Sequence, residues 1–100
     1  MVMAIRGFSR RIQKDELVAI ELLRLRNDIA DTAVMEHTGS MVKAIGDSYL
    51  AMFSSAVEAV ECAFDIQSEV ALRNKYQMSD SKLVLGIGVH IGDVLWEGGS

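Results

Sequence analysis

The sequence predicts an α+β domain in which helices cover one face of an antiparallel four-stranded sheet. Segments with the alternation of strands and segments with the spacing of amphipathic helices follow one another as strand, helix, strand, strand, helix, strand. The two middle strands are separated by Gly46-Asp47, a dipeptide typical of a tight hairpin turn. This order is the split βαβ arrangement called ferredoxin-like, with both helices on one face of the sheet.

The composition indicates a single domain over residues 1–100. Half of the residues are hydrophobic, which is enough for one core. The net charge of −4 argues against non-specific nucleic-acid binding, which needs a basic surface. No uncharged stretch reaches the roughly 18 to 20 residues of a membrane helix. We therefore expect no membrane segment here and a cytoplasmic location, with any membrane attachment made through other domains of a longer protein.

The first strand is expected over Val2 to Phe8, where Gly7 lets the backbone turn or approach a ligand closely. A helical pattern begins at Asp15, with charges such as Arg26 between its apolar positions. Those apolar positions are Leu17, Ile20, Leu23 or Leu25, Ile29 and Val34. Gly39 is expected to end this helix in the left-handed conformation.

Positive charge gathers near the end of the first strand. Arg6, Arg10, Arg11 and Lys14 lie there within nine residues of one another. Such a cluster has two interpretations: it can attract a polyphosphate, or it can be an ordinary solvated face.

The second half of the chain begins with the predicted hairpin strands, Met41 to Ile45 and Tyr49 to Phe53. Ser55 and Glu58 have the spacing of a capping box, so a second helix is expected from there to about Arg73 or Asn74. Its predicted buried positions are Val57, Val60, Ala63, Phe64, Ile66 and Val70, and the lone cysteine, Cys62, is expected to be a small core residue.

The last strand is expected over Lys82 to Gly92, where apolar residues alternate with small or polar ones. One face carries Leu83, Leu85, Ile87, Val89 and Ile91, and the other carries Val84, Gly86, Gly88 and His90. The second face has room for a ligand or a partner chain, so we expect self-association through the side of the sheet that the helices leave open.

Lys43 and Asp47 are isolated charges within apolar runs. On spacing alone, Asp47 suits a turn and Lys43 suits a solvated strand face. The segment KAIGDSYLAMFSS, residues 43–55, also resembles the hairpin of the class III adenylyl and guanylyl cyclases, in which Lys-x-x-Gly-Asp-[Ser or Gly]-x-x-Ala-x-Phe recurs. IRGFS at 5–9, EHTGSMVK at 36–43 and LGIGVHIGDV at 85–94 resemble the same family in the same order.

The resemblance implies a catalytic domain that converts ATP to cyclic AMP and pyrophosphate at the interface of a head-to-tail homodimer. In this family two aspartates of one protomer hold two Mg²⁺ or Mn²⁺ ions, and Asp47 matches one of them. Lys43 matches the adenine-reading lysine, which works in the opposite site. Gly7, Phe8 and Ser9 match the segment expected to contact phosphate near the metals.

Two departures weaken the expectation of activity. Ala4 lies where the family has its other metal aspartate, through substitution or through loss of one residue within Met3-Ala4-Ile5. Either way one carboxylate is absent, and metal binding should be poor. The 100 residues also do not include the family's later segment with a second adenine-reading residue, a ribose-orienting asparagine and a transition-state arginine. We therefore expect this chain alone to be inactive.

Other polar residues offer weaker candidates. Asp93 suits a turn or cap, His90 has no second ligand at metal spacing, and Trp96 suits apolar packing. Ser9 and Ser48 have no evident base, so nucleophilic catalysis has no support. Two rival functions remain open at this stage: a non-catalytic cyclase-like module that dimerises and relays a signal, and an unrelated ferredoxin-like domain such as a small-ligand sensor.

Overall fold

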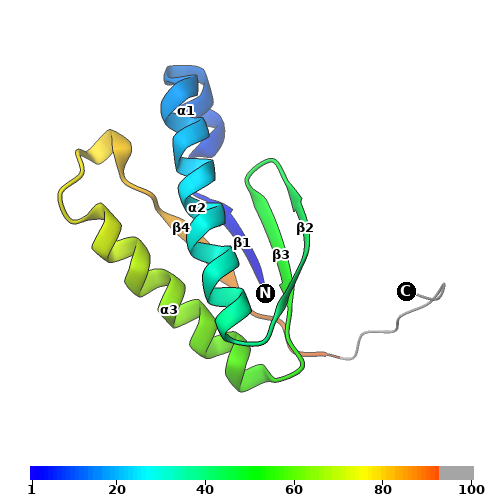
Figure 1. Ribbon diagram of the computed structural model, residues 1–100. Helices are drawn as coiled ribbons and strands as arrows, with labels where there is room; N and C mark the ends of the chain where they lie inside the picture. Colours follow the sequence, from blue (N-terminus) through cyan, green and yellow to red (C-terminus); the bar gives the residue numbers. More distant parts are fainter. Residues whose placement is uncertain (93–100) are drawn as a thin grey trace.

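The computed structural model describes residues 1–92 and has the predicted ferredoxin-like topology. Its elements are β1 (Val2–Ile5), α1 (Phe8–Lys14), α2 (Glu16–Glu36), β2 (Ser40–Ile45), β3 (Ser48–Met52), α3 (Ala56–Asn74), a short 3₁₀ helix (Ser79–Ser81) and β4 (Leu85–Gly88). The sheet order is β2-β3-β1-β4, and all neighbouring strands are antiparallel. Helices α2 and α3 lie side by side over the sheet (Figure 1). No helix within these residues is long and apolar enough to cross a membrane.

The central strand β1 divides its residues between the two faces of the sheet. Met3 and Ile5 are buried in the core under the helices, whereas Val2 is half exposed on the opposite face. Directly paired residues of antiparallel strands point to the same side. The partners of Val2 and Ala4 in β4 are Gly88 and Gly86, so these two glycines line the face without helices, here called the open face.

The first strand is shorter than predicted. It ends at Ile5, and Gly7 turns the chain with a φ of +69°, so the prediction of a strand to Phe8 was wrong. Phe8 instead begins α1 and packs against the core. Arg11 on α1 donates hydrogen bonds to the carbonyl oxygens of Asp80 (2.7 Å) and Lys82 (3.0 Å), which ties α1 to the segment before β4.

The buried faces of α2 and α3 include small residues that were not predicted to be buried, and this corrects part of the predicted stripes. Leu17 and Ile20 on α2 and Val57, Val60 and Phe64 on α3 are exposed. The buried residues are Ala19, Leu22, Arg26, Ile29, Ala30, Ala33 and Val34 on α2, and Ala59, Cys62, Ile66 and Val70 on α3. Cys62 is fully buried as predicted. Small side chains at these contacts let the two helices lie close to each other. They also let both helices lie close to the sheet.

The end of α2 differs from the prediction in one residue. Thr38 has a φ of +55° and takes the left-handed conformation, whereas Gly39 donates its amide to the carbonyl of Val34 (2.8 Å). A glycine is needed at 39 for a different reason. A Cβ atom built there would lie 2.4 Å from the ring of Phe53. The close approach of Phe53 therefore explains this glycine better than helix termination does.

The caps and the last strand were predicted in part. Ser55 Oγ accepts from the Glu58 amide at 3.3 Å as expected, but the Glu58 carboxylate bonds His37 instead of completing a capping box. Leu83 and Leu85 are buried, whereas β4 ends at Gly88, and Val89, His90 and Ile91 beyond it are exposed. Asp93 and Trp96 lie outside the described residues.

Candidate functional site

Asp47 lies in the turn between β2 and β3, as predicted. Gly46 has a φ of +56°, which makes the tight turn possible, and Asp47 follows it in a half-buried position. Asp47 Oδ2 accepts a hydrogen bond from the backbone amide of Ile5 at 3.2 Å. The carboxylate is therefore held beside the last residue of β1.

Ala4 precedes Ile5 and lies on the open face, at the end of the strand that Asp47 contacts. Its methyl group offers no metal ligand. Met3 and Ile5 on either side keep their places in the core. A missing residue within this strand would reverse the faces of the side chains before it, and substitution at position 4 stays a prediction. Asp47 is not part of any group of three metal-ligating side chains within residues 1–92.

Lys43 reaches the open face because β2 contains a bulge. Met41 pairs with Ala51 on the helix side, and an uninterrupted ladder would place Lys43 opposite Tyr49 on that same side. The register shifts between Met41 and Lys43, so that Lys43 pairs with Leu50 instead. A β-bulge re-aims the side chains that follow it. The exposed lysine consequently points away from the helices.

The segment after β1 has mixed surroundings. Gly7 and Ser9 are exposed, and Phe8 packs against the core. Nearby, a recess of about 470 Å³ is lined by Arg6, Gly7, Arg10, Arg11, Lys14, Asp15, Val18 and Asp80. Part of its positive charge is used within the fold, since Arg11 bonds two carbonyls and Lys14 pairs with Asp80 at 3.4 Å.

The sequence analysis missed two hydrogen bonds that connect α2 and the hairpin. The fully buried Arg26 donates from Nη1 to the carbonyl oxygen of Asp47. The buried Tyr49 donates its hydroxyl to Asp31 Oδ1 at 2.5 Å. Burial, followed by the bond to Asp31, raises the pKa of Tyr49, which keeps this hydroxyl a donor. The hairpin is therefore anchored to α2 at its turn and at the start of β3.

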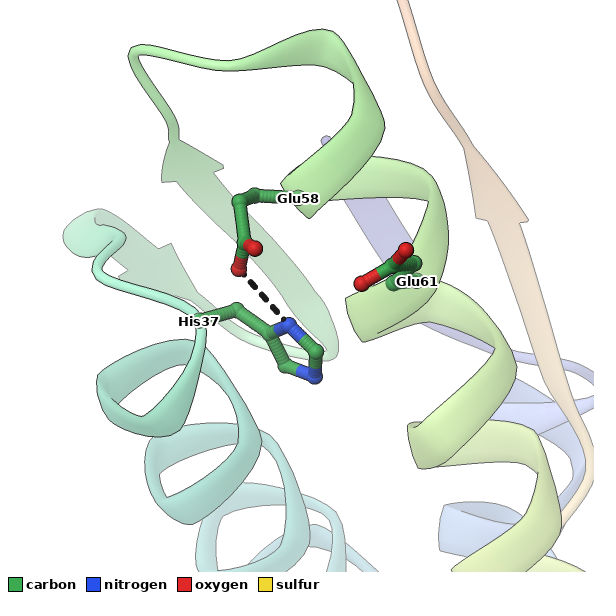
Figure 2. A group of neighbouring side chains, drawn as sticks. All are labelled: His37, Glu58 and Glu61. Atoms are coloured by element: carbon green, nitrogen blue, oxygen red, sulfur yellow. Dashed lines mark hydrogen bonds and ion pairs between the residues drawn. The ribbon is translucent and has the colours of Figure 1, made fainter.

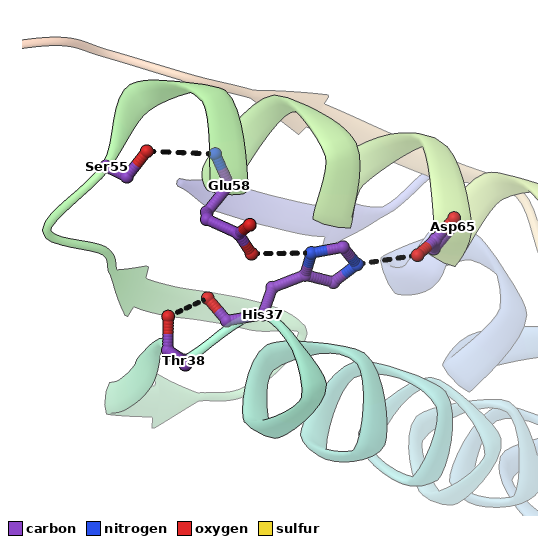
Figure 3. Close-up of polar contacts among 5 residues, drawn as sticks. All are labelled: His37, Thr38, Ser55, Glu58 and Asp65. Carbon is purple, nitrogen blue, oxygen red and sulfur yellow. Dashed lines mark hydrogen bonds and ion pairs between the residues drawn. The ribbon is translucent and has the colours of Figure 1, made fainter.

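A second polar cluster joins the end of α2 to α3. His37, Glu58 and Glu61 have potential ligand atoms within 4.8 Å of one another (Figure 2). His37 Nδ1 lies 2.9 Å from Glu58 Oε2, and Nε2 lies 2.6 Å from Asp65 Oδ2 (Figure 3). An imidazole can donate from both nitrogens only when it is protonated. The cluster is therefore explained as an imidazolium ion paired with carboxylates of α3.

The surroundings of His37 favour this charged form. The hydrogen bonds to Asp65 and then to Glu58 raise the pKa of His37 above its ordinary value of 6.5, against a smaller opposing effect of burial. Both carboxylates come from α3, from its first and third turns. The ion pair thus clamps the two helices together at the end of α2.

The comparisons with known proteins agree on one family. The family described as "Adenylate and Guanylate cyclase catalytic domain" matches residues 1–98. The protein named "Putative adenylate cyclase 3" from Rhizobium meliloti (strain 1021) is 38% identical over 92 residues, which are 91% of this chain and 16% of that protein.

Solved structures show the same fold. An adenylate/guanylate cyclase/hydrolase from Silicibacter pomeroyi matches with a TM-score of 0.83 and 29% identity, over 99% of this chain and 59% of that one. A bacterial light-regulated adenylyl cyclase matches with a TM-score of 0.75 and 21% identity, over 85% of this chain and 47% of that one. This chain thus spans less than two thirds of each relative.

The His37 cluster predicts a pH-dependent contribution to stability. Because the pKa of His37 is raised in the folded state, the protonated ring stabilises the fold fully below pH 6.5, and this stabilisation is lost as the pH rises through the folded-state pKa. Urea unfolding of the wild type and of His37→Gln between pH 5 and 9 should show a difference that is largest near pH 5–6 and vanishes at high pH. His90→Gln, at an exposed position, serves as the control. A difference that grows with pH would contradict the ion pair.

Proposed function

Because this chain belongs to the adenylate and guanylate cyclase catalytic domain family, we propose that it forms part of an adenylyl cyclase domain, which converts ATP to 3′,5′-cyclic AMP and pyrophosphate in intracellular signalling. The observation that carries the proposal is the placement of Lys43 on the open face, in the hairpin whose turn holds Asp47. An ammonium group can donate to a ring nitrogen of adenine, whereas guanine offers donors that suit an acidic residue. The name of the Rhizobium relative agrees with this choice.

The open face supports pairing of two copies. Apolar side chains are exposed there, including Val2 (48%), which pairs with Gly88, and Ile45 (63%) on the edge strand β2. A sheet face of this kind favours association that covers it. In a head-to-tail pair, Lys43 of one copy would read the base in one site and Asp47 of the same copy would serve the other.

The residues present do not fit the family's two-metal site. Divalent Mg²⁺ and Mn²⁺ need several oxygen ligands, and two carboxylates supply them in the family. Here Ala4 supplies none, and Asp47 Oδ2 already accepts from the Ile5 amide. We therefore assign Lys43 to recognition of the base. Asp47 is the one carboxylate of the family's pair that this chain retains.

A second candidate function follows from Ala4. A cyclase-like module that only dimerises and relays a signal needs the open face but not the metal carboxylates. Ala4 fits that function without further assumptions, while Lys43 has no role in it. The two candidates therefore differ in what restoring an aspartate at position 4 should do.

Self-association can be measured on the chain as it stands. Sedimentation at high micromolar concentration should show a monomer–dimer equilibrium, and Val2→Lys should weaken the dimer by roughly tenfold or more, because it buries an unpaired charge. Phe64→Lys on the exposed side of α3 is the matched control, since it also replaces an exposed apolar side chain. A clean monomer, or an equal effect of both variants, would refute pairing through the open face.

Restoring the second carboxylate tests the catalytic proposal. Ala4→Asp should raise Mn²⁺ affinity by about tenfold or more, because two carboxylates would then meet at the end of β1. Asp47→Ala in the Ala4→Asp background should abolish the gain. Titration calorimetry checks binding in this chain, and cyclic AMP formation can be checked in a chimaera that continues Ala4→Asp with the C-terminal part of the Silicibacter relative. Neither gain would appear in a module that acts by association alone.

Base recognition predicts a change of nucleotide preference. In that chimaera, Lys43→Glu should lower the ratio of kcat/KM for ATP over GTP by roughly tenfold or more, because a donor is replaced by an acceptor and a ring nitrogen is left unpaired. GTP need not become a good substrate. Lys75→Glu, at the end of α3, controls for the change in charge. An unchanged ratio would remove Lys43 from base recognition.

A further inference from the structure

Arg26 is a fully buried charge in the middle of α2, surrounded by polar partners of the hairpin. It is 0% exposed. Its Nη1 donates to the carbonyl oxygen of Asp47, and its Nε donates to Asn27 Oδ1 at 2.9 Å. The guanidinium carbon lies 5.3 Å from the centre of the Tyr49 ring. Two of these three contacts are with the hairpin, and the third is with the neighbouring residue of α2.

Stability alone does not account for this arginine. Its Nη2 is buried and, within residues 1–92, has no hydrogen-bond partner. Burial also lowers the pKa of Arg26, against the opposing charges of Asp47, Tyr49 and Asp31. Replacing a whole buried ion pair by apolar side chains of similar volume is often neutral or stabilising, whereas removing one partner of a buried polar contact leaves the other unpaired. What this arginine adds over an apolar side chain is the hydrogen bond to the Asp47 carbonyl.

The guanidinium supplies a fixed point for the turn. All six residues of β2 are exposed, so the hairpin gains little anchoring from that strand. The turn is held instead by two hydrogen bonds. Arg26 on α2 donates to the Asp47 carbonyl, and the Ile5 amide on β1 donates to the Asp47 carboxylate. Moving the backbone of Asp47 would therefore move its carboxylate away from the end of β1.

We propose that Arg26 is a positioning residue for Asp47, and that its hydrogen bond to the Asp47 carbonyl holds the carboxylate at the end of β1, beside position 4. This inference rests on the proposed function for the role of Asp47. The geometry itself can be tested without it. Tyr49 and Asp31 provide a matched comparison, since their bond also ties the hairpin to α2 but does not touch Asp47.

The first experiment measures the geometry in the chain as it stands. Amide hydrogen exchange by NMR would compare Ile5, which donates to Asp47 Oδ2, with Ala51, a sheet amide away from the turn that donates to the Met1 carbonyl at 2.9 Å. Arg26→Met should lower the Ile5-to-Ala51 protection ratio by roughly tenfold, as should Asp47→Ala. Arg26→Lys should restore part of it, and Tyr49→Phe should leave it nearly unchanged.

The outcomes separate positioning from general support. If Arg26→Met lowers the protection of both amides equally, Arg26 only stabilises the fold and the inference fails. If Tyr49→Phe lowers the ratio as much as Arg26→Met, any tether to α2 suffices and the inference also fails. A folded Arg26→Met protein with an unchanged ratio would overturn it outright.

The second experiment connects the position to metal binding. In the Ala4→Asp background, Arg26→Met should weaken Mn²⁺ binding by roughly tenfold, while Tyr49→Phe changes it far less. If Ala4→Asp itself gains no Mn²⁺ affinity, the proposed function fails while the exchange result still decides the role of Arg26. If Ala4→Asp gains affinity and Arg26→Met retains it, the positioning role fails and the proposed function stands.

Discussion

The pairing of β1 with a neighbour on both sides is the constraint on which the rest of the structure depends. Because this strand is central, its residues must alternate between the core and the open face, and Met3 and Ile5 occupy the core. Ala4 is thereby committed to the open face, whatever its side chain. The amide of Ile5 at the end of the same strand fixes Asp47. One strand therefore sets the core, the open face and the placement of the turn.

Much of the fold was predictable because period-two alternation and the Gly46-Asp47 turn are local signals. Which residues of each helix face the core was not predictable in the same way. The prediction chose the large residues Val57, Val60 and Phe64 for the core, whereas α3 leaves them exposed and buries Ala59 beside the predicted Cys62. Hydrophobicity alone favours large side chains, but a helix that packs closely against another helix and a sheet needs small ones at the contact. The short helix α1 was missed because seven residues carry too little periodicity to be recognised.

The candidate site was predictable only as far as the family resemblance reached. Lys43 and Asp47 came from matched motifs, and their roles remain proposals. Arg26 was read as a surface charge, although it lies four residues after Leu22 and three before Ile29, both buried. That spacing is the signal that would have placed it inside. Its partner, the carbonyl of Asp47, lies 21 residues away and could not be inferred from local pattern.

The bulge in β2 makes the pairing register of that strand as important as its composition. Side chains of β2 alternate between the two faces of the sheet. At the shift between Met41 and Lys43 this alternation is offset by one residue. If the ladder continued from Met41 without this shift and with every residue kept, Lys43 would lie opposite Tyr49 under the helices. Every amino acid of the motif would still be present in order. Two chains with identical motifs could thus differ in which face of the sheet carries the lysine, through a shift of one residue in strand pairing.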